Sequence, residues 1–350
     1  MHGGSGRPTV HNRSAGRPVG DPFGHRCGMS PRLPPLPDHA VRRPISVHTG
    51  QRLGLTRHEL DGPLWQPLGR GVRGWSGLDP MDGMTRIHLL AEQLPAGIAI
   101  GGWAALLVRG ASELDGTTGP AGSRPLPVLV HVWPRGRVRP RPGIVVDRSA
   151  LSDSDVGGAD GLLVTSSVRA CFDIMCRNGV EEGLVAADIA GRMTGLTPDE
   201  LVRYVATHRG AAGVPRARLC APLVDPRAAS GPESRLRYVW VVEAGLPRPL
   251  VNPTIVDEWG ELLGKPDLLD DEAGFVVEYD GSQHRALRQH TADNIREEAF
   301  ERAGLTVVRA TAIDLWPRRG ELVRRMREGH ARGLARDRRR DRWGLLTEPS

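Results

Sequence analysis

The sequence predicts a protein of the mixed α/β and α+β class that contains two folded regions. Its 350 residues exceed the ~250–300 residues at which a single hydrophobic core stops growing. Residues 262–279 have the pattern of a β-hairpin. Between residues 127 and 208, strand-like alternation is followed by helix-start signals. Together these observations predict an N-terminal α+β module and a C-terminal region built around a sheet.

The first 50 residues are expected to form a disordered basic tail. They are rich in Gly, Pro, Arg and His, and their apolar residues show no period. A small helical segment follows, with a helix near Arg57–Leu60 and a β-wing near Arg70–Val72. We place the start of the α+β module at residue 51 and its end at residue 215.

Alternating helices and strands are expected across the middle of the chain. Ile87–Leu94 and Gly97–Val108 suggest two short helices. Pro127–Trp133 and Gly143–Arg148 alternate as strands do, with an Arg/Pro-rich turn between them. The sequence therefore predicts a compact mixture of both element types in this module.

Three helices are predicted next. The first spans Thr165–Asp173 and begins at a Ser or Thr cap. The second, Val180–Met193, is amphipathic. The third begins at Thr197, with Pro198 in its first turn, and runs to about residue 208. Residues 209–229 are expected to contain a short helix and then the domain boundary, with residues 216–229 as the linker.

The most informative segment is the predicted hairpin. Leu262–Leu269 is mostly apolar and delivers a carboxylate after a proline, residues 270–274 predict a turn, and Phe275–Tyr279 is a β-branched and aromatic strand. Folding as a hairpin places Asp267 and Glu278 on neighbouring strands. The two carboxylates are then close enough to share one cation.

Carboxylate pairs of this kind are the hard-oxygen ligands that Mg²⁺ prefers. Val276 and Val277 are expected to be buried just before Glu278, where an unpaired carboxylate is costly. Acidic residues on a hairpin also occur at ordinary solvated sheet edges. An acid upstream, Glu233, and His284 downstream favour a nuclease-like metal site over that alternative.

Residues 230–327 resemble the PD-(D/E)XK nuclease superfamily. The closer resemblance is to small domains related to very-short-patch-repair endonucleases. It extends in order over seven segments: Ser230–Arg237, Ala244–Pro249, Gly264–Asp267, Val276–His284, Asp293–Arg296, Ala303–Arg309 and Asp314–Leu315. The resemblance implies a restriction-endonuclease-like mixed sheet flanked by helices at residues 230–330, followed by a basic tail at residues 331–350.

The resemblance also implies site residues. Asp267 and Glu278 match the metal-binding carboxylates, and Glu233 matches a helical acid that often completes the site. The metal implied is Mg²⁺, with Mn²⁺ as a substitute, and no small-molecule cofactor is expected. Ser230 and Glu233 also have capping-box spacing, so Glu233 could instead satisfy a backbone donor.

The chain departs from the superfamily at one catalytic position. Asp280 stands where the superfamily places a catalytic lysine, and the chain's one lysine, Lys265, lies on the earlier strand. The closer relatives also have Asp here, followed by Gly and a downstream His. Gln283 or His284 is therefore expected to orient or deprotonate the attacking water. Alternatively, Asp280 belongs to a turn and His284 is a surface histidine.

DNA is the partner that the resemblance implies, although the residues themselves do not distinguish DNA from RNA. Arginines near the predicted site are candidates for phosphate contacts, or for solvated helix faces. These are Arg235, Arg237, Arg288, Arg296 and Arg309.

A second resemblance concerns the N-terminal module. Ile98–Ala105 is similar to a stretch of AbiEi-type antitoxin proteins, whose N-terminal part is winged-helix-like. The leading functional prediction is a Mg²⁺-dependent DNA endonuclease in repair, defence or mobile-element control. The alternative is a non-catalytic, antitoxin-like DNA-binding regulator with a degenerate nuclease fold. A protein-interaction module is a third possibility.

Charge and composition add limits. The formal net charge is +6, but residues 1–50 carry seven Arg against two Asp, and residues 318–342 carry eleven Arg against four acids. The remainder is net acidic, so the charge does not define a nucleic-acid groove.

No segment reaches the ~18 consecutive apolar residues of a membrane span. The four cysteines lack paired metal spacing, and a reduced cytoplasmic location is expected without a membrane partner.

Overall fold

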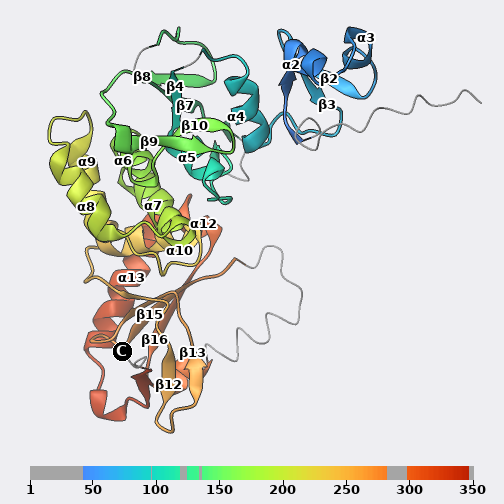
Figure 1. Ribbon diagram of the computed structural model, residues 1–350. Coiled ribbons are helices and arrows are strands. Elements are labelled where there is room, and N and C mark those ends of the chain that lie inside the picture. Colours follow the sequence, from blue (N-terminus) through green and yellow to red (C-terminus); the bar gives the residue numbers. More distant parts are fainter. Residues whose placement is uncertain (1–41, 96, 119–123, 134–135, 282–297, 347–350) are drawn as a thin grey trace, which may run out of the picture. The chain divides into compact units, whose positions relative to one another are not determined.

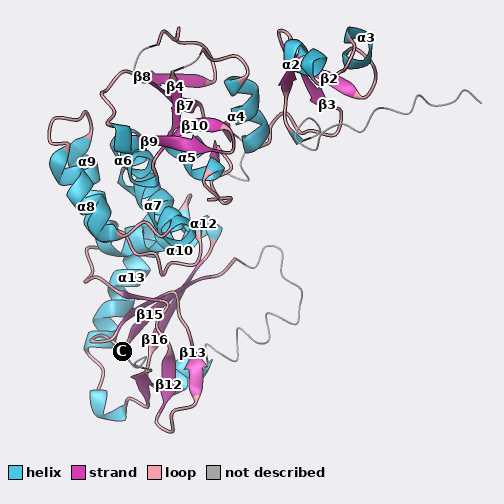
Figure 2. Ribbon diagram, viewed as in Figure 1, coloured by secondary structure: helices cyan, strands magenta, loops and turns pink. Residues whose placement is uncertain are grey.

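A computed structural model describes residues 42–95, 97–118, 124–133, 136–281 and 298–346 (Figure 1). All of them belong to one compact unit, His39–Ser350. Helices and mixed sheets alternate along the chain (Figure 2), which confirms the mixed α/β class. None of the helices in the described ranges is long and apolar enough to cross a bilayer.

A small three-stranded sheet with two short helices opens the described chain. Its elements are β1 (Ile45–Ser46), α2 (Val47–Arg52), α3 (Arg57–Leu60), β2 (Trp65–Gly69) and β3 (Val72–Trp75), with strand order β1-β3-β2. Thr56 and Glu59 form a capping box at α3. Trp65 and Trp75 pack edge to face, 5.9 Å between ring centroids. Regular structure therefore begins at Ile45, inside the segment 1–50 that was predicted to be disordered. The Ser46 side chain accepts from the Thr49 N–H and caps α2.

A five-stranded mixed sheet forms the middle region. Its strands are β4 (Ile98–Gly101), β7 (Val128–Val132), β8 (Ile144–Asp147), β9 (Val156–Ala159) and β10 (Leu162–Thr165), in the order β8-β7-β4-β10-β9. β5 (Thr117–Thr118) and β6 (Arg124–Pro125) form a separate pair. The two strands predicted from alternation are confirmed as β7 and β8. The helix predicted at Gly97–Val108 was wrong for its first half, because that apolar run begins as the buried strand β4.

Six helices accompany this sheet: α4 (Gly83–Ala91), α5 (Gly102–Val108), α6 (Ser167–Asn178), α7 (Val180–Thr194), α8 (Pro198–Thr207) and α9 (Val214–Cys220). Ser166 caps α6, and Thr197 with Glu200 forms a capping box at α8, as the sequence predicted. α9 is the short helix expected within residues 209–229. The rest of the segment expected as a linker contains the buried Val224 and Ala228, which pack into the core.

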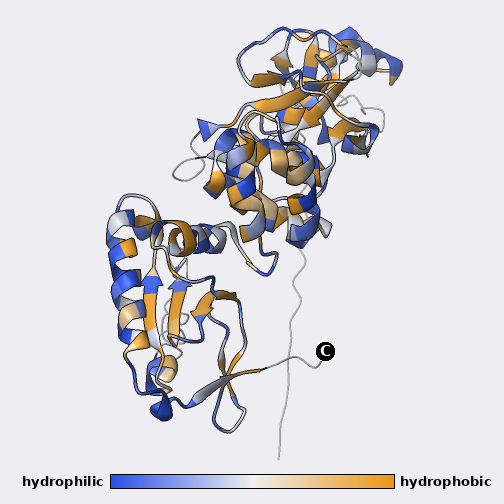
Figure 3. Ribbon diagram, turned by 90° about the vertical axis from the view of Figure 1, so that its left-hand side faces the viewer, coloured by the Kyte–Doolittle hydropathy of each residue, from blue (hydrophilic) through white to orange (hydrophobic). Residues whose placement is uncertain are grey.

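The C-terminal region has a four-stranded mixed sheet with order β11-β14-β15-β16. The strands are β11 (Leu250–Val251), β14 (Leu268–Asp270), β15 (Phe275–Tyr279) and β16 (Thr306–Ala310), accompanied by α10 (Gly231–Tyr238), α12 (Ala312–Leu315) and α13 (Arg319–Leu334). β14 and β15 are antiparallel, whereas β15 and β16 are parallel. α13 packs on β15 and β16, and the strands are mainly apolar in Figure 3.

A second small sheet supports the rear of the hairpin. Its order is β13-β12-β17, formed by β12 (Ile255–Asp257), β13 (Leu262–Gly264) and β17 (Trp343–Leu345). The predicted strand Leu262–Leu269 is therefore two strands in different sheets, interrupted at residues 265–267. The predicted basic tail was also wrong in part, because α13 extends to Leu334 and β17 pairs with β12.

Candidate functional site

The predicted carboxylate hairpin is present. In the β14–β15 ladder, Leu268 pairs with Val277, so Asp267 lies opposite Glu278 one step further along. Val276 and Val277 are fully buried, and Glu278 is only 5% exposed. The β-branched strand thus brings a carboxylate into an almost dry position. The predicted strand, Phe275–Tyr279, has the same bounds in the structure.

Asp267 is held against the neighbouring strand. The backbone N–H of Tyr279 donates to Asp267 Oδ2 at 2.6 Å. This charge-assisted hydrogen bond fixes the carboxylate beside the strand that carries Glu278. Pro266 is buried just before it, so the chain enters β14 with little freedom. Burial raises the pKa of the Tyr279 phenol, and repulsion between its phenolate form and the Asp280 carboxylate raises that pKa further.

Glu233 lies in the first turn of α10 and caps it. Its Oε2 accepts from the N–H of Ala229 at 2.7 Å, and its Oε1 accepts from the hydroxyl of Ser230 at 2.8 Å. Asn252 Nδ2 donates to the same Oε2 at 3.0 Å. Glu233 therefore has the capping role that the sequence left open. Its bond to Asn252 also connects it to the segment that pairs with Asp267.

The three predicted metal-binding acids do not converge on one possible ion position. In the described part of the chain, Glu233, Asp267 and Glu278 do not have ligand atoms within 4.8 Å of one another as a set. Mg²⁺ commonly keeps several waters and uses one or two carboxylates. A Mg²⁺ site of that kind would require only Asp267 and Glu278 as direct ligands, without Glu233.

Residues beside Glu278 extend the site. Arg309 on β16 is its register partner, and the N–H of Asp280 donates to Ala310 O at 2.7 Å. Arg309 therefore lies on β16, and Asp280 directly follows the end of β15. Gln283, His284, Arg288 and Arg296 lie outside the described residues.

Two predicted phosphate contacts do not suit that role. Arg237 is 2% exposed and pairs with Asp188 and with the carbonyl of Leu223. Arg235 donates to Glu182 at 2.8 Å and to Glu181 at 3.1 Å. A phosphate contact by either side chain would have to displace an existing ion pair, one that is fully buried for Arg237 and partly exposed for Arg235. We therefore correct the assignment: these arginines on α10 are used inside the protein.

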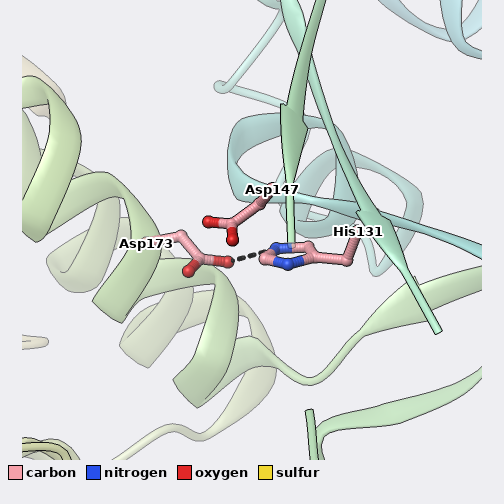
Figure 4. Close-up of side chains that lie close together, drawn as sticks. All are labelled: His131, Asp147 and Asp173. Carbon is pink, nitrogen blue, oxygen red and sulfur yellow. Dashed lines mark hydrogen bonds and ion pairs between the residues drawn. The ribbon is translucent and has the colours of Figure 1, made fainter. Parts of the chain in front are cut away.

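A second cluster was not foreseen from the sequence. Register in the parallel β7–β8 pair places His131 beside Asp147, and both meet Asp173 from α6 (Figure 4). Among described residues, this is the one group of three whose possible ligand atoms all lie within 4.8 Å. The signal for it was a polar residue near the end of each predicted strand, but strand pairing and contact with α6 are not readable from composition.

The cluster could offer three ligand atoms, yet its charges are already compensated. His131 Nε2 donates to Asp173 Oδ2 at 2.8 Å, because a carboxylate can only accept. Arg169 Nε donates to the other Asp173 oxygen at 2.9 Å. Arg177 pairs with Asp147. Two guanidinium groups thus balance two carboxylates without an ion.

The histidine itself is also poorly prepared to bind a metal. A metal on Nε2 would transfer the ring proton to Nδ1, and ligating histidines usually donate that N–H to an acceptor. Nδ1 of His131 is buried and has no partner among the described atoms. We therefore interpret the cluster as a charge-neutral link between β7, β8 and α6.

A cavity of about 580 Å³ adjoins this cluster. Trp103 and Trp316 line it, together with Asp173 and Arg177. Three of its acids are paired with arginines: Asp173 with Arg169, Glu113 with Arg192 and Glu182 with Arg235. The fourth, Asp115, accepts from the N–H and hydroxyl of Thr117. One exposed acid does not define a ligand class.

Comparisons with known proteins identify relatives without a described activity. The chain is similar to "Uncharacterized protein MT2308" of Mycobacterium tuberculosis strain CDC 1551 / Oshkosh and to "Uncharacterized protein Rv2248" of strain ATCC 25618 / H37Rv. Each is 26% identical over 274 residues, or 78% of this chain and 96% of the relative. No family model and no solved structure matches the chain. Functional inference therefore depends on the site geometry.

Proposed function

We propose that this protein is a Mg²⁺-dependent DNA endonuclease of the very-short-patch-repair-like type, acting in repair, defence or mobile-element control. The observation that carries the proposal is the hairpin, where Asp267 lies opposite the buried Glu278 and is held by the Tyr279 amide. Carboxylate oxygens paired on neighbouring strands are the hard ligands that Mg²⁺ prefers.

The order of elements supports the same proposal. A capped helix with an acid in its first turn, α10, precedes the acidic hairpin, and β16 adds in parallel to β15 before α12 and α13. A restriction-endonuclease-like assignment of residues 230–330 agrees with this order. It also explains why polar residues concentrate where β15 ends.

Chemically, Asp267 and Glu278 would hold the ion through carboxylate oxygens. A bound Mg²⁺ neutralises charge on a phosphodiester and lowers the pKa of water. Arg309, the register partner of Glu278 on β16, would add positive charge near the same edge of the sheet. Gln283 or His284 would orient or deprotonate the attacking water, a contribution of roughly 10²- to 10⁴-fold for a well-placed group.

A second candidate is supported by the N-terminal region. β2 and β3 form a hairpin that follows the two short helices α2 and α3 in the chain. The exposed Arg70 lies at the turn of this hairpin. Arg52 and Arg57 are also exposed on α2 and α3. Such a winged-helix-like arrangement fits an antitoxin-like DNA-binding regulator, and it is compatible with targeting a nuclease.

The test is cleavage of supercoiled, linear and mismatched duplex DNA with Mg²⁺, Mn²⁺ or EDTA. Asp267→Asn is the informative variant, because its amide oxygen can still accept from Tyr279 while the charge is lost. Asp271→Asn, an exposed acid in the same hairpin turn, is the matched control. Metal-dependent cutting by wild type and Asp271→Asn, but not by Asp267→Asn, supports the nuclease.

Absence of cutting on every substrate, with DNA binding that is unchanged in Asp267→Asn, would overturn the nuclease proposal. The regulator would then be tested with Arg70→Ala. A lower affinity and a shallower dependence of affinity on salt would identify the N-terminal hairpin as the DNA contact.

A further inference from the structure

Asn252 joins the acid of α10 to the strand that carries Asp267. It follows β11 and precedes Pro253. Its backbone is in the left-handed region at φ 50°, one of two non-glycine residues in the described chain with positive φ. A residue before proline is ordinarily pushed to extended conformations, so this backbone is strained and its neighbours must hold it there.

Three hydrogen bonds hold the residue in place. Its backbone N–H donates to Asp267 O at 3.0 Å. Its side-chain Nδ2 donates to Arg227 O at 2.7 Å and to Glu233 Oε2 at 3.0 Å. Both side-chain partners are pure acceptors, which fixes the orientation of the amide. Both amide protons are therefore used.

These contacts form one chain of bonds across the candidate site. It runs from the Glu233 carboxylate through Asn252 to the backbone of Asp267, whose own carboxylate is bound by Tyr279 N–H next to Glu278. Ordinary helix capping explains the bonds from Ala229 and Ser230 to Glu233. It does not require a donor from another strand.

We propose that Asn252 is a positioning residue for the metal site, acting by fixing where the Glu233 carboxylate lies relative to Asp267 and Glu278. This inference rests on the proposed nuclease function. Glu233 has three donors on its two oxygens, which leaves about one lone-pair position. That position suits a water of the ion's hydration shell, and outer partners of this kind tune metal affinity.

Asn252→Gly separates the side chain from the backbone. Glycine adopts positive φ without strain and keeps the N–H that donates to Asp267 O, so only the amide is removed. We expect Asn252→Gly to fold and to bind Mn²⁺ about 10-fold more weakly, the lower end of the range for lost outer partners. Asn252→Asp, which sets a carboxylate against Glu233, should bind more weakly than the wild type as well.

The measurement is Mn²⁺ titration followed by calorimetry, with thermal unfolding of each variant as the folding check. Asp160→Gly is the matched control, because Asp160 also has positive φ but lies between β9 and β10. Its Mn²⁺ affinity is expected to equal that of the wild type. Asp267→Asn shows whether the titrated ion is the one at the hairpin.

A double-mutant cycle tests the route through Glu233. If Asn252 acts through that carboxylate, Asn252→Gly adds no further loss in a Glu233→Gln background. Additive losses, or unchanged affinity in Asn252→Gly while Asp267→Asn abolishes binding, would overturn the positioning role alone. Mn²⁺ binding that is absent, or insensitive to Asp267→Asn, would overturn the proposed function and this inference with it.

Discussion

Two acid clusters in this protein are built in opposite ways. In the middle region, Asp147 and Asp173 each pair with a guanidinium, and His131 completes a network with no net charge. In the C-terminal region, Glu233 is bound by neutral donors, an amide N–H, a hydroxyl and an Asn side chain. Asp267 also accepts from a backbone N–H.

The kind of partner decides whether a buried carboxylate can still attract a cation. Guanidinium partners satisfy a buried carboxylate and remove its attraction for a cation. Neutral donors orient a carboxylate but leave its charge in place. A cluster of ligand-type residues is therefore less informative than the charge of what surrounds it, and by this criterion Glu233 keeps more attraction for a cation than Asp147 or Asp173 does.

The largest effect is expected from Asp173→Ala. The change leaves Arg169, which is 3% exposed, without its carboxylate, and leaves His131 without its acceptor. Removing one partner of a buried ion pair costs about 3–5 kcal/mol. Urea unfolding followed by circular dichroism measures the loss. A change below about 1 kcal/mol would contradict the structural interpretation of this cluster.

Asp267→Asn should have the converse profile. We expect cleavage to fall by about 100-fold or more, because a metal ligand should matter at least as much as the outer partners that cost 10- to 100-fold. The unfolding midpoint should stay near that of the wild type, since the asparagine oxygen still accepts from Tyr279. Equal cleavage by Asp267→Asn and Asp271→Asn would remove the distinction between the two clusters.

Gly101→Ala tests the packing around His131. An added Cβ would lie 2.8 Å from both Cδ2 and Nε2 of the His131 ring, which is fully buried. Overpacking of this kind costs about 1–3 kcal/mol. Gly158→Ala on β9, whose Cβ would have no heavy atom within 4 Å, is the matched control. Comparable unfolding midpoints for the two variants would show that the ring moves freely.

The smallest effect concerns pH. Burial raises the pKa of Asp147, but hydrogen bonds from Ser149 and the Arg177 charge outweigh it and lower the pKa to about 2. A depressed carboxyl pKa contributes stability above the unfolded value near 3.9, and that contribution is lost as pH falls toward 2. We expect about 1–2 kcal/mol, reduced from the full shift by the exposure of Arg177. Asp147→Asn should flatten the unfolding free energy between about pH 5 and 2; an unchanged slope would exclude Asp147 as its source.

Local signals in the sequence predicted local structure well. Thr197, Pro198 and Glu200 predicted the start of α8, and the β-branched run predicted the bounds of β15, because caps and strand patterns act over a few residues. The opposition of Asp267 and Glu278 followed from the short turn between their strands. The same reasoning could not place Asn252, whose role depends on the β11–β14 register.

Long-range partners were beyond the sequence. Nothing near Arg237 indicates that it pairs with Asp188, 49 residues away, nor that His131 meets Asp173, 42 residues away. Ile98–Gly101 was predicted to be helical because an apolar run of that length has no clear period. Its pairing with β7 and β10 makes this segment a strand. These outcomes depend on which elements meet in the fold.

The pairing of β17 with β12 also prevents the edge of β12 from pairing with other copies of the protein. β17 covers one side of β12, and Trp343 packs in a cluster with Val276 on the rear of the hairpin. Trp259 and Leu262 in the adjoining β12–β13 hairpin are 77% and 64% exposed. Proteolytic loss of β17 would uncover a row of unpaired N–H and C=O groups beside those apolar side chains. The clipped protein would then pair edge to edge with its own copies and aggregate.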